Sequence, residues 1–121
     1  MNGTIIRLLL LTALCLVPVF AADIDGKWTA TYDTQNGQTT TTWELKADGT
    51  KLTGKAESSV GERQISEGKI EGKEVSWVEV LDIAGMTIRI TCKGTLNGDE
   101  LKLSRSAEVF GSIEAVAKRV K

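Results

Sequence analysis

The chain has 121 residues, with 15 basic and 16 acidic side chains, a formal net charge of −1, and no histidine. Because there is no basic excess, we expect no nucleic-acid binding, and the interspersed charges are typical of a solvated surface. The lack of histidine excludes Ser–His and Cys–His nucleophile pairs and most metal sites, so we predict a non-enzymatic protein with no metal and no cofactor.

The first 22 residues have the pattern of a secretory signal peptide. Arg7 supplies a short positive region, residues 8–20 form an apolar run, and Ala21 and Ala22 contribute to a small-x-small cleavage pattern. The apolar run is shorter than the roughly 20 residues that a membrane-spanning helix needs. We therefore expect an exported protein, secreted or periplasmic, in which residues 23–121 form a single domain without a membrane span.

Seven glycines recur every 11 to 13 residues in this domain: Gly37, Gly49, Gly61, Gly72, Gly85, Gly98 and Gly111. Glycine reaches positive φ without a steric penalty, and a preceding Asn or Asp favours a tight hairpin turn. The stretches between these turns are rich in Thr, Val, Ile and Trp, which is typical of strands. The spacing predicts eight strands, over residues 26–34, 38–47, 51–60, 62–70, 74–83, 86–96, 99–109 and 113–120.

The first three predicted strands alternate apolar and polar residues, which indicates one buried face. Trp28 and Trp43 lie on the buried faces of the first and second strands, and the third strand offers small residues on its own. Small inward residues either make room for bulky neighbours such as Trp43 or line a cavity. The small residues in question, with one from strand 86–96, are Gly54, Ala56, Ser58 and Gly94.

The next strands are less regular. In residues 62–70 the apolar Ile65 and Ile70 have opposite parity, so we predict a bulge near Gly68. Residues 74–83 are apolar on both faces, which leaves open whether the face of Trp77 or the face of Val80 is buried. Strand 86–96 alternates cleanly and directs its even-numbered residues from Met86 to Leu96 inward; one of them is Cys92, the one cysteine in 23–121, which we interpret as a buried inert thiol.

Short connections between consecutive strands favour sequential antiparallel pairing. Pairing the eighth strand with the first removes both exposed edges. We therefore predict an all-β fold, an eight-stranded antiparallel up-and-down meander that closes into a small barrel. An interior of this size holds packed side chains or one small ligand. The alternative is a two-layer sandwich of the same strands.

Gly26-Lys27-Trp28, at the start of the first strand, resembles the Gly-x-Trp signature of the lipocalins and the wider calycin group. The resemblance implies a lipocalin-like barrel in which this tryptophan packs against a basic residue from late in the chain, here Arg105 or Arg119. The ending Lys118-Arg119-Val120 is similar to the last strand of fatty-acid-binding proteins, where an arginine holds a ligand carboxylate. The chain lacks room for the added helices of either group.

Residues 26–30, 46–56 and 117–121 also resemble a family of small exported bacterial domains of uncharacterised role. Such domains occur alone or appended to polysaccharide-degrading enzymes. The resemblance implies accessory or carbohydrate-linked work, with a polysaccharide as the partner, and it supplies no catalytic residues.

Glu79 and Arg105 are the most informative charged residues. Glu79 shares parity with Trp77, and Arg105 shares parity with Leu103, so both are expected to point inward. A buried charge is costly unless it is paired, so the two side chains face each other or a ligand. The alternative is a bulge or a strand end that places one or both in solvent.

The sequence leads to two functional hypotheses. The first is an exported barrel, expected to be a monomer, that binds a small apolar or amphipathic molecule in its interior through Glu79, Arg105, Trp77 and Arg119. The second is an accessory carbohydrate-binding domain, in which Trp77 lies on the outer surface as an aromatic platform, or a protein-interaction domain that contacts a partner protein through an outer face.

Overall fold

The computed structural model describes residues 23–121 except residues 36 and 110, so the predicted signal peptide lies outside the described residues. The described residues form nine strands: β1 (Gly26–Thr34), β2 (Gly37–Asp48), β3 (Lys51–Ser58), β4 (Gly61–Gln64), β5 (Ser66–Glu71), β6 (Glu74–Ile83), β7 (Met86–Asn97), β8 (Glu100–Ala107) and β9 (Gly111–Arg119). Among the described residues, no helix has the length and apolar character that crossing a membrane requires.

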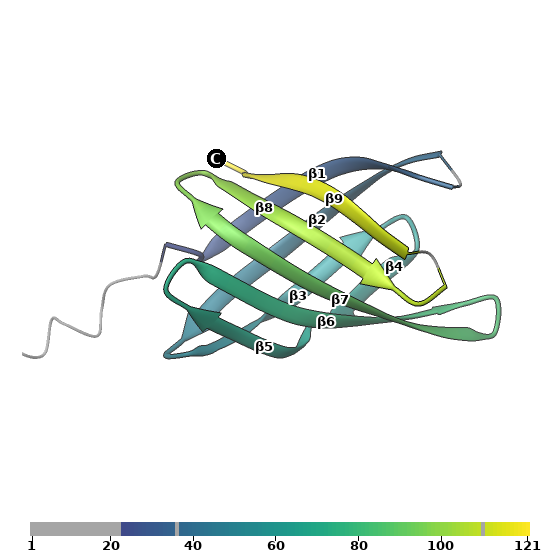
Figure 1. Cartoon of the computed structure of the whole chain (residues 1–121), viewed down its shortest axis with the longest axis horizontal. Coiled ribbons are helices and arrows are strands. Elements are labelled where there is room, and N and C mark those ends of the chain that lie inside the picture. Colours follow the sequence, from purple (N-terminus) through teal and green to yellow (C-terminus); the bar gives the residue numbers. More distant parts are fainter. Residues whose placement is uncertain (1–22, 36, 110) are drawn as a thin grey trace, which may run out of the picture.

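The strands form one antiparallel sheet that closes on itself as a barrel (Figure 1). The ring runs β1, β2, β3, then β5 to β9, and β4 pairs with the part of β3 that β5 does not reach. It closes where β9 pairs with β1 at two positions, Trp28 with Arg119 and Thr29 with Lys118. The predicted eight-stranded meander is thus confirmed, with β4 and β5 together in the place of the fourth predicted strand.

The division of residues 62–70 has a steric cause. The pairing of β5 with β6 shifts register between Ser66 and Lys69, and Glu67 has a φ of 52°. A Cβ atom on Gly68 would lie 1.9 Å from the carbonyl oxygen of Leu52, so only glycine allows this approach of the two backbones. The predicted bulge is confirmed, and it explains why the apolar parity reverses within this stretch.

All seven turn glycines have positive φ, between 59° and 116°, as predicted from their spacing. Figure 1 shows that the turns alternate between the two ends of the barrel. We call the end with the turns after β2, β5 and β7 the base, and the end with the turns after β1, β3, β6 and β8 the mouth. The C-terminus lies at the base (Figure 1).

Three tryptophans, Trp28, Trp43 and Trp77, are fully buried inside the barrel. The rings of Trp43 and Trp77 meet edge to face, with centroids 6.2 Å apart. Ala56 pairs with Trp43 across β2 and β3 and is itself fully buried.

Two of the small inward residues, Ala56 and Gly94, make room for large neighbours, and Gly54 allows a close approach of two backbones. A Cβ on Gly94 would lie 2.7 Å from a methyl group of Leu103. A Cβ on Gly54 would lie 1.9 Å from the carbonyl oxygen of Glu44. The structure also shows which face of β6 is buried, a point that the sequence left open: Trp77 faces inward and Val80 is 42% exposed. The prediction that Met86 points inward is wrong, because it lies at a turn of the mouth and is 53% exposed.

Candidate functional site: a charged cluster inside the barrel

Glu79 and Arg105 face each other inside the barrel, as one of the two sequence interpretations predicted. Glu79 comes from β6 and Arg105 from β8, two strands away across β7. Arg105 Nη1 donates a hydrogen bond of 2.7 Å to Glu79 Oε2, and Nη2 donates one of 3.4 Å to Oε1. The Glu79 side chain is fully buried and that of Arg105 is 6% exposed, so the pair is shielded from water.

A second arginine, Arg63 of β4, binds the same carboxylate. Its Nε donates a hydrogen bond of 3.0 Å to Glu79 Oε1, and its Nη2 also donates to this oxygen. Its Nη1 donates to Ser58 Oγ and to the carbonyl oxygen of Gly61, which fixes the guanidinium from the other side. Arg63, Glu79 and Arg105 are here called the charged cluster; two guanidinium groups and one carboxylate leave it with an excess positive charge of one.

Neutral donors complete the coordination of Glu79. The indole Nε1 atoms of Trp43 and Trp77 each donate a hydrogen bond of 2.8 Å to Oε2. The thiol of Cys92 lies 3.4 Å from the same oxygen. The two tryptophans therefore join the apolar interior of the barrel to the charged cluster. A buried indole N–H needs a hydrogen-bond acceptor, and Glu79 Oε2 provides it for both rings.

The carboxylate of Glu79 stays ionised over a wide pH range. Burial by itself raises the pKa of Glu79, but the charge and hydrogen bonds of Arg105, the charge of Arg63 and the indole of Trp77 outweigh it and lower the pKa to about 2. Burial raises the pKa of the Cys92 thiol well above its usual range, so it stays protonated, as the interpretation of an inert thiol predicted.

The guanidinium of Arg105 is also packed between aromatic rings. Its Cζ lies 5.3 Å from the centroid of the Trp43 ring and 5.6 Å from that of Tyr32. Tyr32 is a half-buried residue of β1, and its hydroxyl hydrogen-bonds the hydroxyl of Thr41 at 2.8 Å. Tyr32 is thus the residue through which β1 reaches the charged cluster.

The wall of the barrel is open next to Tyr32. The ladder between β1 and β9 stops after Thr29 and Lys118, so residues 30–33 of β1 and 111–117 of β9 are not in register with each other across this boundary. We call this stretch the seam. A groove of about 660 Å³ lies over it, lined by Thr31, Tyr32, Asp33, Lys102, Ile113, Glu114, Ala115 and Val116. Ile113 is the register partner of Arg105, which places the charged cluster directly behind this part of the wall.

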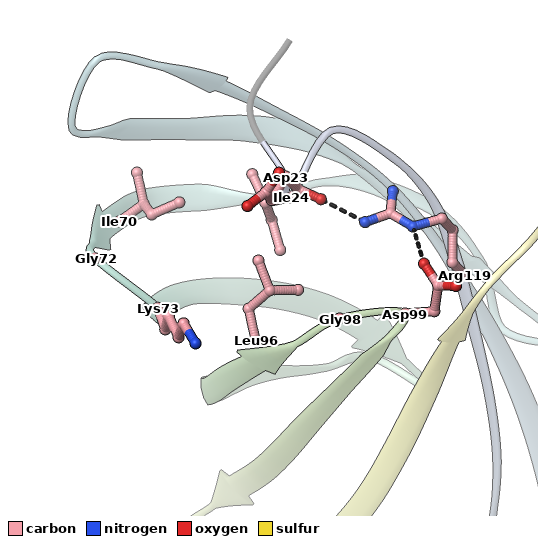
Figure 2. Close-up of a pocket in the computed structure, with 9 residues that line it drawn as sticks. All are labelled: Asp23, Ile24, Ile70, Gly72, Lys73, Leu96, Gly98, Asp99 and Arg119. Carbon is pink, nitrogen blue, oxygen red and sulfur yellow. Dashed lines mark hydrogen bonds and ion pairs between the residues drawn. The ribbon is translucent and has the colours of Figure 1, made fainter.

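A second hollow, of about 430 Å³, lies at the base (Figure 2). Ile24 and Leu96 point toward each other across it, and Lys73, Asp99 and Arg119 contribute charged groups. This pocket is separate from the seam groove and shares no lining residue with it.

Arg119 closes the base rather than reaching the charged cluster. Its guanidinium lies 4.4 Å from the centroid of the Trp28 ring, so it is the late basic residue that the calycin resemblance implied. It donates hydrogen bonds to the backbone carbonyls of Asp23 and Asp25 and to the carboxylate of Asp99. Because these acceptors engage all three of its nitrogens, the geometry gives no support to the prediction that Arg119 binds a ligand.

Of the predicted site residues, Glu79, Arg105 and Trp77 come together and Arg119 lies apart. Trp77 is 1% exposed and its indole is bound to Glu79, so it does not form an aromatic platform on the outer surface. The sequence interpretation missed Arg63. Its parity matches that of the inward Ile65, and this signal was available, but the bulge that follows obscured the facing of the whole stretch. No group of three or more potential metal ligands occurs within the described part of the chain.

Comparisons with known proteins give a fold but no family. No family model matches the chain, and no curated protein matches its sequence. Among solved structures, a mutant of the fluorescent protein UnaG is similar, with a TM-score of 0.52 and 14% sequence identity over 82% of this chain and 97% of that chain. At this identity the likeness shows the fold alone, a small closed antiparallel β-barrel over the described residues.

Proposed function

We propose that this chain is a non-enzymatic, exported barrel that binds a small amphipathic molecule at the seam. The observation that carries the proposal is the groove of about 660 Å³ beside an interior charged cluster. Ligand sites in proteins combine a concave, largely apolar surface with a few convergent polar groups, and they usually measure about 300–1,000 Å³. Tyr32, Ile113 and Ala115 supply apolar surface here, and the polar groups of the lining come from Thr31, Asp33, Lys102 and Glu114. Arg105 does not line the groove but is the register partner of Ile113.

The location differs from the expectation of a ligand in the barrel centre. The three tryptophans and the fitted residues around them fill that centre, so a ligand of useful size has its place at the seam instead. The alternative of an accessory carbohydrate-binding domain finds no supporting observation, because Trp77, the residue on which it depended, is buried.

Export forms a separate part of the proposal and rests on the sequence pattern of residues 1–22. Expression of the full chain in a bacterial host, followed by mass measurement of the exported fraction, tests it directly. We expect a product that begins at Asp23. Recovery of the uncleaved chain from the cytoplasm alone would contradict export and would leave the binding proposal unaffected.

The binding proposal is tested with dodecanol as the probe and a variant that fills the groove. Ile113→Trp adds volume at a half-buried groove residue, and Val80→Trp makes a comparable change on the exposed face of β6, away from the groove. We expect Ile113→Trp to weaken dodecanol binding by roughly tenfold or more, whereas Val80→Trp leaves it unchanged. Calorimetric titration and native mass spectrometry report affinity and stoichiometry. Absence of binding to the wild-type protein, or equal affinities of all three proteins, would overturn the proposal.

A further inference from the structure

We propose that the ligand of the seam is an extended basic peptide, which pairs with the free edges of β1 and β9 and places a cationic side chain between Asp33 and Glu114. This inference rests on the proposed function and specifies the chemical class of its amphipathic ligand. Three observations carry it: the strand edges beyond the end of the ladder, the groove that both strands line, and the two carboxylates on opposite sides of that groove.

The seam leaves backbone groups of both strands without a neighbouring strand in register. Val120 donates its backbone N–H to the carbonyl oxygen of Lys27, which fixes the residues of β1 and β9 that face each other across the boundary. Alternate residues of a strand direct their backbone N–H and C=O groups to the same side. Beyond the last paired position, the residues that direct these groups toward the seam are therefore Thr31, Asp33, Glu114 and Val116.

The groove gives a peptide access to these backbone groups. All four of the residues just named line it, and Figure 1 shows β1 and β9 diverging toward the mouth after their paired positions. A strand edge with unpaired backbone groups is a template for a further strand, and peptide-binding domains use such edges for recognition. An extended peptide in the groove therefore finds donors and acceptors on both sides, whereas a molecule with one polar end satisfies only a few of them.

The side chains along the seam suit a strand with alternating character. Tyr32 and Ala115 lie at inward positions of β1 and β9 and are half-buried and buried, whereas Asp33 and Glu114 are exposed on the outer side. Successive side chains of a strand point to opposite faces. A bound peptide would thus direct every second side chain against the apolar residues and the others between the carboxylates.

The charge of the outer side selects a basic peptide. Continued in the register of Thr29 with Lys118, the ladder would set Asp33 opposite Glu114, and like charges directly opposite each other destabilise an antiparallel pair. Within the described part of the chain, neither carboxylate forms an ion pair. A lysine or arginine side chain of an added strand would lie between the two carboxylates and interact favourably with both. Lys102, the one basic residue of the groove lining, offsets a single negative charge.

The test uses five-residue peptides with blocked ends, in which valine alternates with lysine or with glutamate. We expect the wild-type protein to bind the lysine peptide at least about tenfold more tightly than the same peptide with methylated backbone nitrogens, because methylation removes the donors and keeps the side chains. We also expect it to prefer the lysine peptide over the glutamate peptide by about fivefold or more. Calorimetric titration measures these affinities.

Paired substitutions test the two carboxylates. Asp33→Asn combined with Glu114→Gln should reduce the preference for lysine over glutamate to about twofold or less. The matched control, Asp48→Asn combined with Glu57→Gln, neutralises two exposed carboxylates of β2 and β3 outside the groove and should leave the preference unchanged. An equal loss of preference in both double variants would contradict the placement of the cation.

Amide hydrogen exchange locates the bound peptide. Saturating lysine peptide should slow exchange at the amides of Thr31 and Val116 by at least about tenfold more than saturating dodecanol does. Unchanged exchange at both amides in the peptide complex would overturn the inference. Binding of dodecanol without binding of the lysine peptide, or equal binding of the methylated and unmethylated peptides, overturns the inference while the proposed function stands. Binding of neither compound overturns the proposed function itself.

Discussion

Glu79 and Arg105 are joined by a hydrogen bond of 2.7 Å in a position where neither side chain is more than 6% exposed. Two indoles and a second guanidinium bind the same carboxylate, so both of its oxygens accept several hydrogen bonds. Such a carboxylate holds together strands that are distant in the ring, because its partners come from β2, β4, β6 and β8. We therefore expect that removal of this carboxylate disturbs all four of these strands rather than a single contact.

Glu79→Gln should destabilise the protein by about 3–5 kcal/mol, because it leaves two buried guanidinium groups without an anion. Equilibrium unfolding in urea measures this free energy. The matched control is Glu44→Gln, which removes an exposed carboxylate that pairs with Lys27 and Lys55 and should cost less than about 1 kcal/mol. Similar losses in the two variants would contradict the assigned role of Glu79.

The dependence of the unfolding free energy on pH should reveal the contribution of Glu79. The pKa of Glu79 is lowered from 4.5 to about 2 in the folded protein, so its ionised form stabilises the fold above pH 4.5. This contribution, on the order of 3 kcal/mol, should be lost as the pH falls from about 4.5 to 2. Unfolding free energies measured across this range should decline more steeply in the wild-type protein than in Glu79→Gln; parallel curves would refute the assignment.

The sequence predicted the barrel because its signals were local. Turn glycines and alternating residues indicate the strands and most of their inward faces, and the parity of Glu79 and Arg105 offered the inward pair as one of two interpretations. The role of Arg63 was not predicted, although its parity matches that of the inward Ile65, because the bulge between Ser66 and Lys69 left the inward face of residues 62–70 ambiguous. The seam was not predicted either, since the length of the β1–β9 ladder depends on how the whole barrel twists.

Two glycines of the fold should be intolerant of a side chain for reasons of space. A Cβ on Gly54 or Gly68 would lie 1.9 Å from a backbone carbonyl oxygen, which cannot move as a side chain does. Gly68→Ala should therefore cost more than about 2 kcal/mol. Gly72→Ala is the comparison: its φ of 59° is unfavourable for alanine but the space is open, and we expect a loss of about 1 kcal/mol. Thermal unfolding ranks the two, and the reverse order would disprove the steric argument.

The base should depend on Arg119. Arg119→Gln removes the stacking on Trp28 and the hydrogen bonds to the carbonyls of Asp23 and Asp25. We expect a loss of about 1–3 kcal/mol and faster amide hydrogen exchange in residues 23–28. Arg89→Gln, which breaks only an exposed ion pair with Glu67, should change neither quantity by a comparable amount. Unchanged exchange at the base in Arg119→Gln would show that other contacts hold this segment.

The large separation of β1 and β9 along the chain also indicates the order in which the barrel assembles. The contact between Arg119 and Asp25 joins residues 94 positions apart, whereas the other neighbours in the ring are close along the chain. The entropy lost on closing a loop grows with its length, so hairpins form on the microsecond timescale and the contact of longest sequence separation forms after them. Docking of the first strand on the last is therefore the late step of folding, and the seam marks the place where the finished barrel opens first.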